Sequence, residues 1–174
     1  MEQELVKELQ TVRKARIKDV PAIQQLVNSF ADEGAMLHRP LSEIYENLRD
    51  FLVVEVDGQV VGCCALHINW EDLVEIKALA VAVEWQRKGF GTMLVKECLR
   101  EARELGLPTV FALTLKPEFF SKLGFVQEDI ARLPRKVWGE CYRCVKFPNC
   151  DEVAMVYYFE PHTFRRLNCD LMHR

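Results

Sequence analysis

Residues 86–91, Gln-Arg-Lys-Gly-Phe-Gly, have the composition of an anion-binding loop. The two glycines let backbone N–H groups approach a ligand without a Cβ in the way, and Arg87 and Lys88 add full positive charges. A predicted helix follows at once, and its first turn contributes unpaired N–H groups and the positive end of the helix dipole. The segment therefore predicts a pyrophosphate cradle. It matches neither a Walker loop nor the dinucleotide fingerprint, and an ordinary glycine-bearing turn stays an alternative.

A candidate general base, Glu75, lies within the apolar run of residues 71–83. A carboxylate among apolar neighbours loses solvation, which raises its pKa toward the range of a useful base. Strand alternation predicts two faces, with Glu75, Lys77 and Leu79 on one and Ile76, Ala78 and Ala80 on the other. A solvated Glu75–Lys77 pair is the alternative interpretation.

Three cysteines, Cys141, Cys144 and Cys150, form a C-x2-C-x5-C pattern whose first half is typical of a zinc half-site. A closed site needs a fourth ligand, and the candidates are Cys169, His162, His67 and Cys64. Unligated thiols and a redox pair are the alternatives that stay open. The seven cysteines are an odd number and no export signal precedes them, so we expect reduced thiols and a cytoplasmic location.

The elements that must position these residues follow from the spacing of the apolar residues. Strands are expected at 11–17, within 51–68 as two strands joined by a tight turn at Asp57-Gly58, and at 71–83, 109–115, 125–130 and 152–159. Helices are expected from Pro21 to Gly34 with Asp19 as N-cap, after Ser42 as N-cap, at 92–106 and at 117–124.

This order of elements predicts an α/β (α+β) fold with a mixed, mostly antiparallel sheet and helices on both faces. The strands at 71–83 and 109–115 are joined through a helix, so we expect them to be parallel and connected by a right-handed crossover. The 174 residues suffice for a single domain over 1–174, with residues 1–10 as an N-terminal extension and 161–174 as a C-terminal tail.

Composition and charge exclude several classes of protein. Hydrophobic residues make up 49% and charged residues 28% of the chain, which is typical of a globular domain. No apolar run approaches the about 20 residues that a membrane helix needs. The net charge of −3 lacks the basic balance of a nucleic-acid-binding protein. We therefore expect neither a membrane nor a nucleic acid as partner, although basic residues cluster at 13–18 and 131–146.

With these elements in place, the chain resembles the GNAT superfamily of acyl-CoA-dependent N-acetyltransferases. The resemblance rests on the strand VEIKALAVAV, the loop QRKGFG, the amphipathic helix after it, the strand FALTL and the segment EFFSKLGF. It implies a GNAT-like sheet with a splayed parallel central pair, and acetyl-CoA as the cosubstrate. The residues implied to bind acetyl-CoA are Leu79, Ala80, Val81, Val83, Gln86, Arg87, Lys88, Gly89, Phe90, Gly91, Thr92 and Phe120.

Further segments, among them VRKARIKDVPAIQQLV, EGAMLHRPLSEI and EFFSKLGF, are similar to the short stand-alone form of amino-acid N-acetyltransferases. These N-acetylglutamate synthases begin arginine biosynthesis. The resemblance implies transfer of acetyl from acetyl-CoA to the α-amino group of L-glutamate by direct attack, with Glu75 as general base. Arg39 and Lys77 are candidates to bind the substrate carboxylates, and backbone N–H groups near Val81 to stabilise the oxyanion.

One departure and two alternatives accompany this resemblance. Phe120 stands where many family members have a tyrosine, and a phenyl ring cannot donate the proton that such a tyrosine supplies. The acceptor could instead be another amino acid, a small amine or a protein N-terminus, and the domain could be a non-catalytic acyl-CoA-binding module. The expected partner is a small-molecule amino acid, and the resemblance allows a homodimer.

Overall fold

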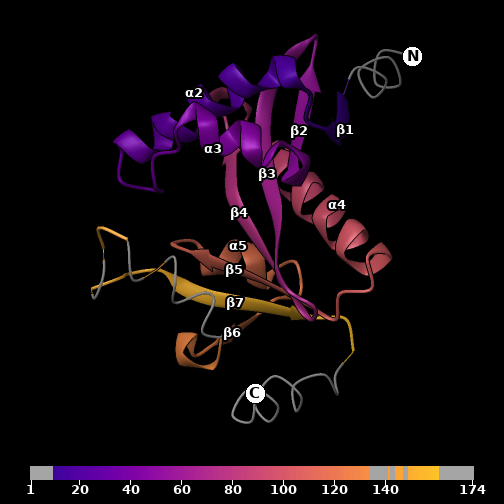
Figure 1. Ribbon diagram of the computed structural model, residues 1–174, viewed down its shortest axis with the longest axis vertical. Helices are drawn as coiled ribbons and strands as arrows, with labels where there is room; N and C mark the ends of the chain where they lie inside the picture. Colours follow the sequence, from indigo (N-terminus) through magenta and orange to yellow (C-terminus); the bar gives the residue numbers. More distant parts are fainter. Residues whose placement is uncertain (1–9, 134–140, 142–143, 147–148, 161–174) are drawn as a thin grey trace. The chain divides into compact units, whose positions relative to one another are not determined.

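In the computed structural model, which describes residues 10–133, 141, 144–146 and 149–160, the strands of the described chain form one seven-stranded sheet (Figure 1). The strand order is β1-β2-β3-β4-β5-β7-β6. The strands are β1 (Gln10–Lys14), β2 (Phe51–Val56), β3 (Gln59–Trp70), β4 (Leu73–Val81), β5 (Thr109–Thr114), β6 (Val126–Glu128) and β7 (Val153–Tyr158). The α-helices are α2 (Val20–Asp32), α3 (Leu41–Glu46), α4 (Phe90–Glu104) and α5 (Pro117–Ser121).

The sheet is mixed, as the order of elements predicted. Antiparallel pairing joins β1 to β2, β2 to β3, β5 to β7 and β6 to β7, whereas β4 and β5 are parallel. The parallel register runs from Leu73 opposite Thr109 to Glu75 opposite Phe111. Beyond that register β4 continues to Val81. The parallel pair therefore meets only over the first part of β4.

Contacts divide the chain into two compact units. One contains the residues up to His67 together with Ile76–Glu101, and the other contains Ile68–Glu75 together with the residues from Ala102 onward. The expected single domain over 1–174 stays a prediction. Residues 1–9 and 161–174, in which the expected extension and tail fall, lie outside the described residues. Among the helices described, none is long and apolar enough to cross a membrane.

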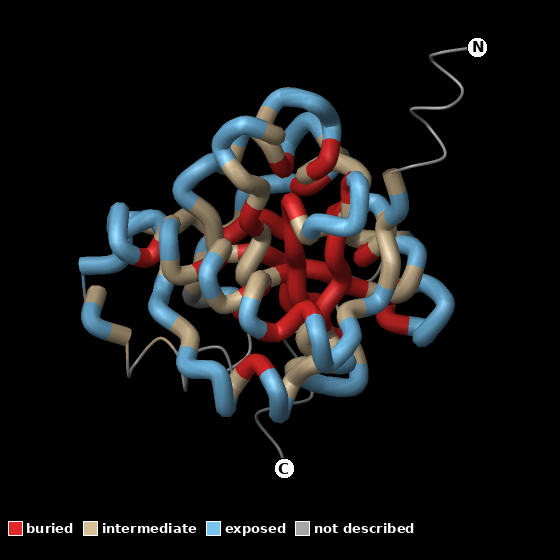
Figure 2. The backbone as a smooth tube through the Cα atoms, turned by 90° about the horizontal axis from the view of Figure 1, so that it is seen from above, coloured by how far each residue is buried: buried red, intermediate tan, exposed pale blue. Residues whose placement is uncertain are grey.

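The first unit carries helices on both faces of its strands, as expected. Cys63 and Ala65 of β3 belong to a core cluster with side chains of α2 and α3. Cys64 points to the other face, where its Sγ lies 3.4 Å from that of Cys98 in α4. A Cβ at Gly62 would come within 3.4 Å of Leu94 on the same helix. The buried positions follow the strands, and the exposed ones lie mostly on the loops and helices (Figure 2).

The second unit has its own core. Its central cluster consists of Leu73, Phe111, Leu133, Ala154 and Val156. A series of aromatic contacts continues from α5 to the end of β7, through Phe119, Phe120, Phe125, Tyr157 and Phe159, with neighbouring ring centroids 5.1–5.4 Å apart. The segment EFFSKLGF thus contributes its rings to this core.

Local predictions were partly correct. The turn at Asp57-Gly58 is confirmed, with φ values of 49° and 78° that match a tight hairpin turn. The strand predicted over 11–17 ends at Lys14, and Ile17, which was expected to be one of its apolar residues, is 65% exposed. Ser42 lies inside α3, whose N-cap is Pro40.

Asp19 occupies the predicted N-cap position of α2, but the expected capping hydrogen bond is absent because a stronger partner binds its carboxylate. Asp19 is the residue before α2 but makes no capping hydrogen bond to that helix. Its oxygens instead accept hydrogen bonds from the Arg13 guanidinium at 2.7 and 3.0 Å and from the Arg16 N–H at 2.7 Å. Arg13 also pairs with Glu55 of β2. A partly buried guanidinium thus ties the start of α2 to the first two strands.

Replacing Asp19 with Asn should therefore lower the free energy of unfolding at pH 7 by about 2 kcal/mol, because it removes charge-assisted hydrogen bonds from the partly buried Arg13, which keeps Glu55 as its other partner. The Arg13 hydrogen bonds hold the pKa of Asp19 below its ordinary value, so the native state gains stability above about pH 4 and loses it as the pH falls further. The deficit of Asp19→Asn should then shrink below pH 4 in urea unfolding curves. Asp32→Asn, at a 73% exposed ion pair, should change little. A deficit independent of pH would contradict this account.

Candidate active site

Strand β4 departs from regular strand geometry at Ala78, which has a φ of 53° in the left-handed region that residues with a Cβ rarely adopt. Lys77 lines a pocket together with Phe51 and Ala65. Ala78, the next residue, packs against the core cluster that contains the same two side chains. The prediction that Lys77 and Ala78 lie on opposite faces is therefore wrong, because the positive φ interrupts the alternation of the strand.

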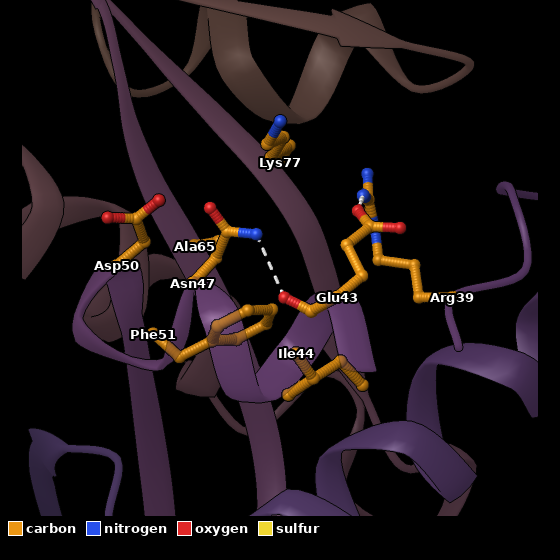
Figure 3. A pocket seen from close by; sticks show the side chains of 8 residues that line it. All are labelled: Arg39, Glu43, Ile44, Asn47, Asp50, Phe51, Ala65 and Lys77. Atoms are coloured by element: carbon orange, nitrogen blue, oxygen red, sulfur yellow. Dashed lines mark hydrogen bonds and ion pairs between the residues drawn. The ribbon is translucent and has the colours of Figure 1, made fainter. Parts of the chain in front are cut away.

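The pocket brings together the two residues expected to bind substrate carboxylates. Arg39 comes from the loop before α3 and Lys77 from β4 (Figure 3). The lining residues are Arg39, Glu43, Ile44, Asn47, Asp50, Phe51, Ala65 and Lys77. Two of them are cations and two are carboxylates. This balance suits a ligand that carries both signs of charge.

Helix α2 fixes the backbone of Arg39. The side chain of Asn28 accepts a hydrogen bond from the Arg39 N–H at 2.9 Å and donates one to the Arg39 carbonyl at 3.2 Å. Gln24 donates a second hydrogen bond to that carbonyl, also at 3.2 Å. The Arg39 guanidinium forms an ion pair with Glu43, one turn into α3. Both ends of this residue are therefore positioned by neighbouring helices.

Sequence reasoning missed a second polar pair at the pocket, Asp50 and His67. Asp50 lines the pocket, and its Oδ2 lies 2.6 Å from Nδ1 of His67 on β3. Strands β2 and β3 are antiparallel, and Phe51 is paired with Ala65. Asp50 precedes Phe51 and His67 follows Ala65 by two residues, so this register brings the two side chains together. Only the hairpin register could have predicted this contact. The two residues lie 17 positions apart and match no motif.

Glu75, the expected base, is 9% exposed and lies in β4 two residues before Lys77. Its backbone is in the regular parallel register opposite Phe111, before the interruption at Ala78. The burial that the argument for a raised pKa requires is thus present. Its role as a base stays a prediction.

The loop at 86–91 turns sharply just before α4 and exposes its backbone. Arg87 and Gly89 have positive φ values of 61° and 89°, and α4 begins at Phe90. The Gln86 side chain donates a hydrogen bond to the Val81 carbonyl at 3.1 Å, which fastens the loop to the end of β4. Residues 87–89 are exposed, and a Cβ at Gly89 would meet nothing within 4 Å. The backbone here is accessible to an external ligand.

A stacked cation lies next to the loop. The Lys88 Nζ lies 4.4 Å from the centroid of the Trp85 ring, and that ring lies 5.8 Å from Phe90. The indole restricts where the lysine charge can be, which favours a fixed anionic partner. Phe90 itself is buried, so only its backbone can contribute to a ligand.

The other residues expected to bind acetyl-CoA have different surroundings. Gly91 and Thr92 lie in the first turn of α4. Leu79 and Val81 are partly buried, Ala80 is buried, and Val83 is 70% exposed beyond the strand. Phe120 is buried between Phe119 and Phe125 in the core of the second unit. Their cofactor roles stay predictions.

The predicted zinc site is not supported. Among the residues that the structure describes, no three His, Cys, Asp or Glu side chains form a group that could hold a metal ion. Burial, followed by the charges of Cys150 and Glu75, raises the pKa of the Cys141 thiol to about 11, which opposes the thiolate form that zinc needs.

The candidates for a fourth zinc ligand give no further support. Cys64 contacts Cys98, and His67 pairs with Asp50. The remaining two, Cys169 and His162, lie outside the described residues.

Comparison with known proteins adds a family and relatives. Residues 20–125 match the model of the acetyltransferase (GNAT) family. An uncharacterized N-acetyltransferase from Chlorobaculum tepidum is 41% identical, over 83% of this chain and 94% of that relative. An amino-acid acetyltransferase from Mycobacterium tuberculosis is also 41% identical, over 76% of this chain and 77% of its own length.

A solved structure shares the arrangement of elements. The crystal structure of N-acetylglutamate synthase from Neisseria gonorrhoeae, complexed with coenzyme A and N-acetyl-glutamate, matches with a TM-score of 0.78 and 29% identity. The match covers 87% of this chain but 35% of that one, so this chain spans about a third of the synthase.

If the loop at 86–91 cradles a pyrophosphate, Gly89→Ala should raise the Kd for CoA about tenfold, because a Cβ at this positive φ forces the backbone N–H groups to shift. Gly58→Ala is the matched control, since Gly58 has a φ of 78° and equally open surroundings at the hairpin tip. Both variants should lose some thermal stability, and only Gly89→Ala should lose affinity in titration calorimetry. Equal CoA affinities would remove the loop from the binding site.

Proposed function

The chain belongs to the GNAT acetyltransferase family, and we propose that it transfers the acetyl group of acetyl-CoA to the α-amino group of L-glutamate. The observation that carries this proposal is the pocket shared by Arg39 and Lys77. Each was a candidate carboxylate-binding residue on its own, and they are 38 positions apart in the sequence. An acidic amino acid has two carboxylates for two cations.

The relatives support the same acceptor class. The mycobacterial relative is named an amino-acid acetyltransferase, and the neisserial synthase was crystallised with N-acetyl-glutamate, the product of this reaction. We infer that this chain supplies the same product, and that its place is the first step of arginine biosynthesis. A small-molecule amino acid is then the partner.

Acetyl-CoA supplies the activated thioester carbonyl, and the residues of the loop at 86–91 suit its pyrophosphate. Backbone N–H groups of residues 87–89 and of the first turn of α4 can donate to phosphate oxygens. Lys88, stacked on Trp85, adds a positive charge at the same place. Leu79, Ala80 and Val81 of β4 are the proposed contacts of the acyl-carrying arm.

The proposed chemistry is direct aminolysis. Glu75 accepts a proton from the substrate ammonium, which frees the nitrogen lone pair to attack the acetyl carbon. The new C–N bond forms and the C–S bond breaks, with the sulfur leaving as a thiolate that keeps the electron pair. The second proton, which the nitrogen loses as the amide forms, passes to that thiolate or to solvent. Backbone N–H groups near Val81 stabilise the negative charge that develops on the acetyl oxygen. No residue has to donate a proton to the sulfur, because a thiol has a pKa of about 8.5 and its thiolate is therefore a good leaving group.

The proposal is tested by a panel of amines with acetyl-CoA, following release of free CoA. L-Glutamate should give the highest kcat/KM, with N-acetylglutamate as the product seen by mass spectrometry. Polyamines should react poorly, because they carry no carboxylate for Arg39 and Lys77.

Variants of the pocket test whether Arg39 binds the substrate. Arg39→Ala should raise the KM for glutamate by about tenfold or more, whereas Lys96→Ala, on the exposed side of α4, should not. Release of no CoA with any amine would reject the catalytic proposal and favour an acyl-CoA-binding module. Preference for another amino acid would reject glutamate as the substrate but would leave the proposed acetyl transfer in place.

The role of Glu75 has its own test. Glu75→Gln should lower kcat by about 10²-fold at neutral pH, because the amide cannot accept the ammonium proton. Glu71→Gln removes an exposed carboxylate just before β4 and serves as the matched control with an unchanged kcat. The loss should lessen as the pH rises toward the pKa of the free amine. A normal kcat in Glu75→Gln would exclude it as the base.

A further inference from the structure

We propose that Asp50, positioned by His67, binds the ammonium group of the amino-acid substrate and so makes the pocket selective for zwitterions. The inference deepens the proposed function and rests on it. Neither residue was expected in the acetyl-transfer site, and His67 was considered only as a zinc ligand. The argument comes from the charges around the pocket and from the hydrogen bonds that already occupy some of them.

The two carboxylates of the pocket differ in what already binds them. Glu43 forms an ion pair with the Arg39 guanidinium one helical turn away. Asp50 uses one oxygen, Oδ2, for His67, and within the described chain its Oδ1 has no hydrogen bond. Glu43 also uses one oxygen, but its charge is already offset by a guanidinium, whereas Asp50 is paired with an imidazole. Asp50 is therefore the carboxylate that we assign to the ligand ammonium.

The Asp50 carboxylate is held firmly. Its own N–H donates to the Asn47 carbonyl at 3.0 Å, and the next residue, Phe51, begins β2 and pairs with Ala65. His67 approaches from the neighbouring strand, with Nδ1 at 2.6 Å. A group fixed on its backbone side and on one oxygen presents the other oxygen in a defined direction, which is what recognition of a single ammonium requires.

The charges of the pocket then correspond to those of an acidic amino acid. Lys77 and Arg39 suit the carboxylates, and Asp50 suits the ammonium. The same arrangement disfavours two simpler ligands. A dicarboxylate without an amino group meets repulsion from Asp50, and a polyamine meets repulsion from the two cations.

Figure 3 shows the Asp50 carboxylate beside Asn47 and the Lys77 and Arg39 side chains at other points of the same pocket. Because the cations and Asp50 line one pocket, one ligand can contact both signs of charge. His67 is not among the lining residues, so it acts through Asp50 as a positioning residue.

The test compares L-glutamate with glutarate, which has both carboxylates and no amino group. In Asp50→Asn, the KM for glutamate should rise about tenfold or more while kcat stays within about twofold. The inhibition constant of glutarate should fall or stay unchanged, because the substitution removes a repulsive charge. These opposite responses separate ammonium binding from a general loss of structure, which would weaken both ligands and overturn the proposal.

Variants of His67 test its positioning role, and the exposed Asp32–His38 pair provides a matched control. His67→Leu removes the donor to Asp50 and should raise the KM for glutamate, whereas His67→Asn keeps a donor near Nδ1 and should restore it. Asp32 and His38 form an exposed pair with the same 2.6 Å separation, outside the pocket lining, so Asp32→Asn should leave KM and glutarate inhibition unchanged. Equal effects at Asp32 and Asp50 would overturn the proposal.

The outcome also separates this inference from the proposed function. If the wild-type protein acetylates another amino acid, glutamate is wrong, and Asp50→Asn is then measured with that amino acid and its analogue without the amino group. Opposite responses to that pair would still support the role of Asp50. If the wild-type protein acetylates only amines without a carboxylate, the zwitterion pocket is overturned directly.

Discussion

The left-handed backbone of Ala78 is the constraint on which the arrangement of the pocket depends. A residue with a Cβ in this region costs about 1 kcal/mol or more, and the surrounding structure has to offset that cost. Ala78 packs against the core beneath α2 and α3, and its carbonyl accepts a hydrogen bond from the Cys63 thiol at 3.5 Å. Lys77, next to the interruption, lines the pocket, whereas Glu75, two residues before Lys77, keeps its regular register with β5. One strand can thus carry a buried carboxylate and a pocket cation.

Two arginines with the same exposure differ in how many of their N–H donors are already used. This difference distinguishes an arginine that stabilises the fold from one that can still bind a ligand. The side chains of Arg13 and Arg39 are both 17% exposed. Arg13 donates from Nε and both terminal nitrogens, chiefly to Asp19 and Glu55, and so has little capacity for a ligand. Arg39 makes one side-chain hydrogen bond, to Glu43, among the residues described. Its other N–H donors are available to an external carboxylate, since a guanidinium carries five.

Sequence periodicity predicted the order of the elements, the hairpin and the parallel pair, because these follow from burial patterns that a single segment already displays. What it could not predict were outcomes of competition between segments. Asp19 is a good N-cap residue, yet Arg13 from another element binds its carboxylate more strongly. The interruption at Ala78 has no glycine to mark it, and the Asp50–His67 pair depends on a strand register. Arg39 and Lys77 could each be named from their own segment and line one pocket, whereas the Asp50–His67 contact could not be named from either segment alone.

The cysteines illustrate the same limit in a different chemistry. Spacing allowed a metal because C-x2-C can place two thiols together, but metal binding also requires that the thiols lose their protons. Burial works against this at two of the described cysteines, since it raises the pKa of Cys63 to about 12 and that of Cys141 to about 11. Cys64 and Cys98, wholly buried and in contact, fill the space between β3 and α4 as small apolar side chains do. A thiol spacing therefore predicts a metal site only when the fold also leaves the thiolate solvated or paired with positive charge.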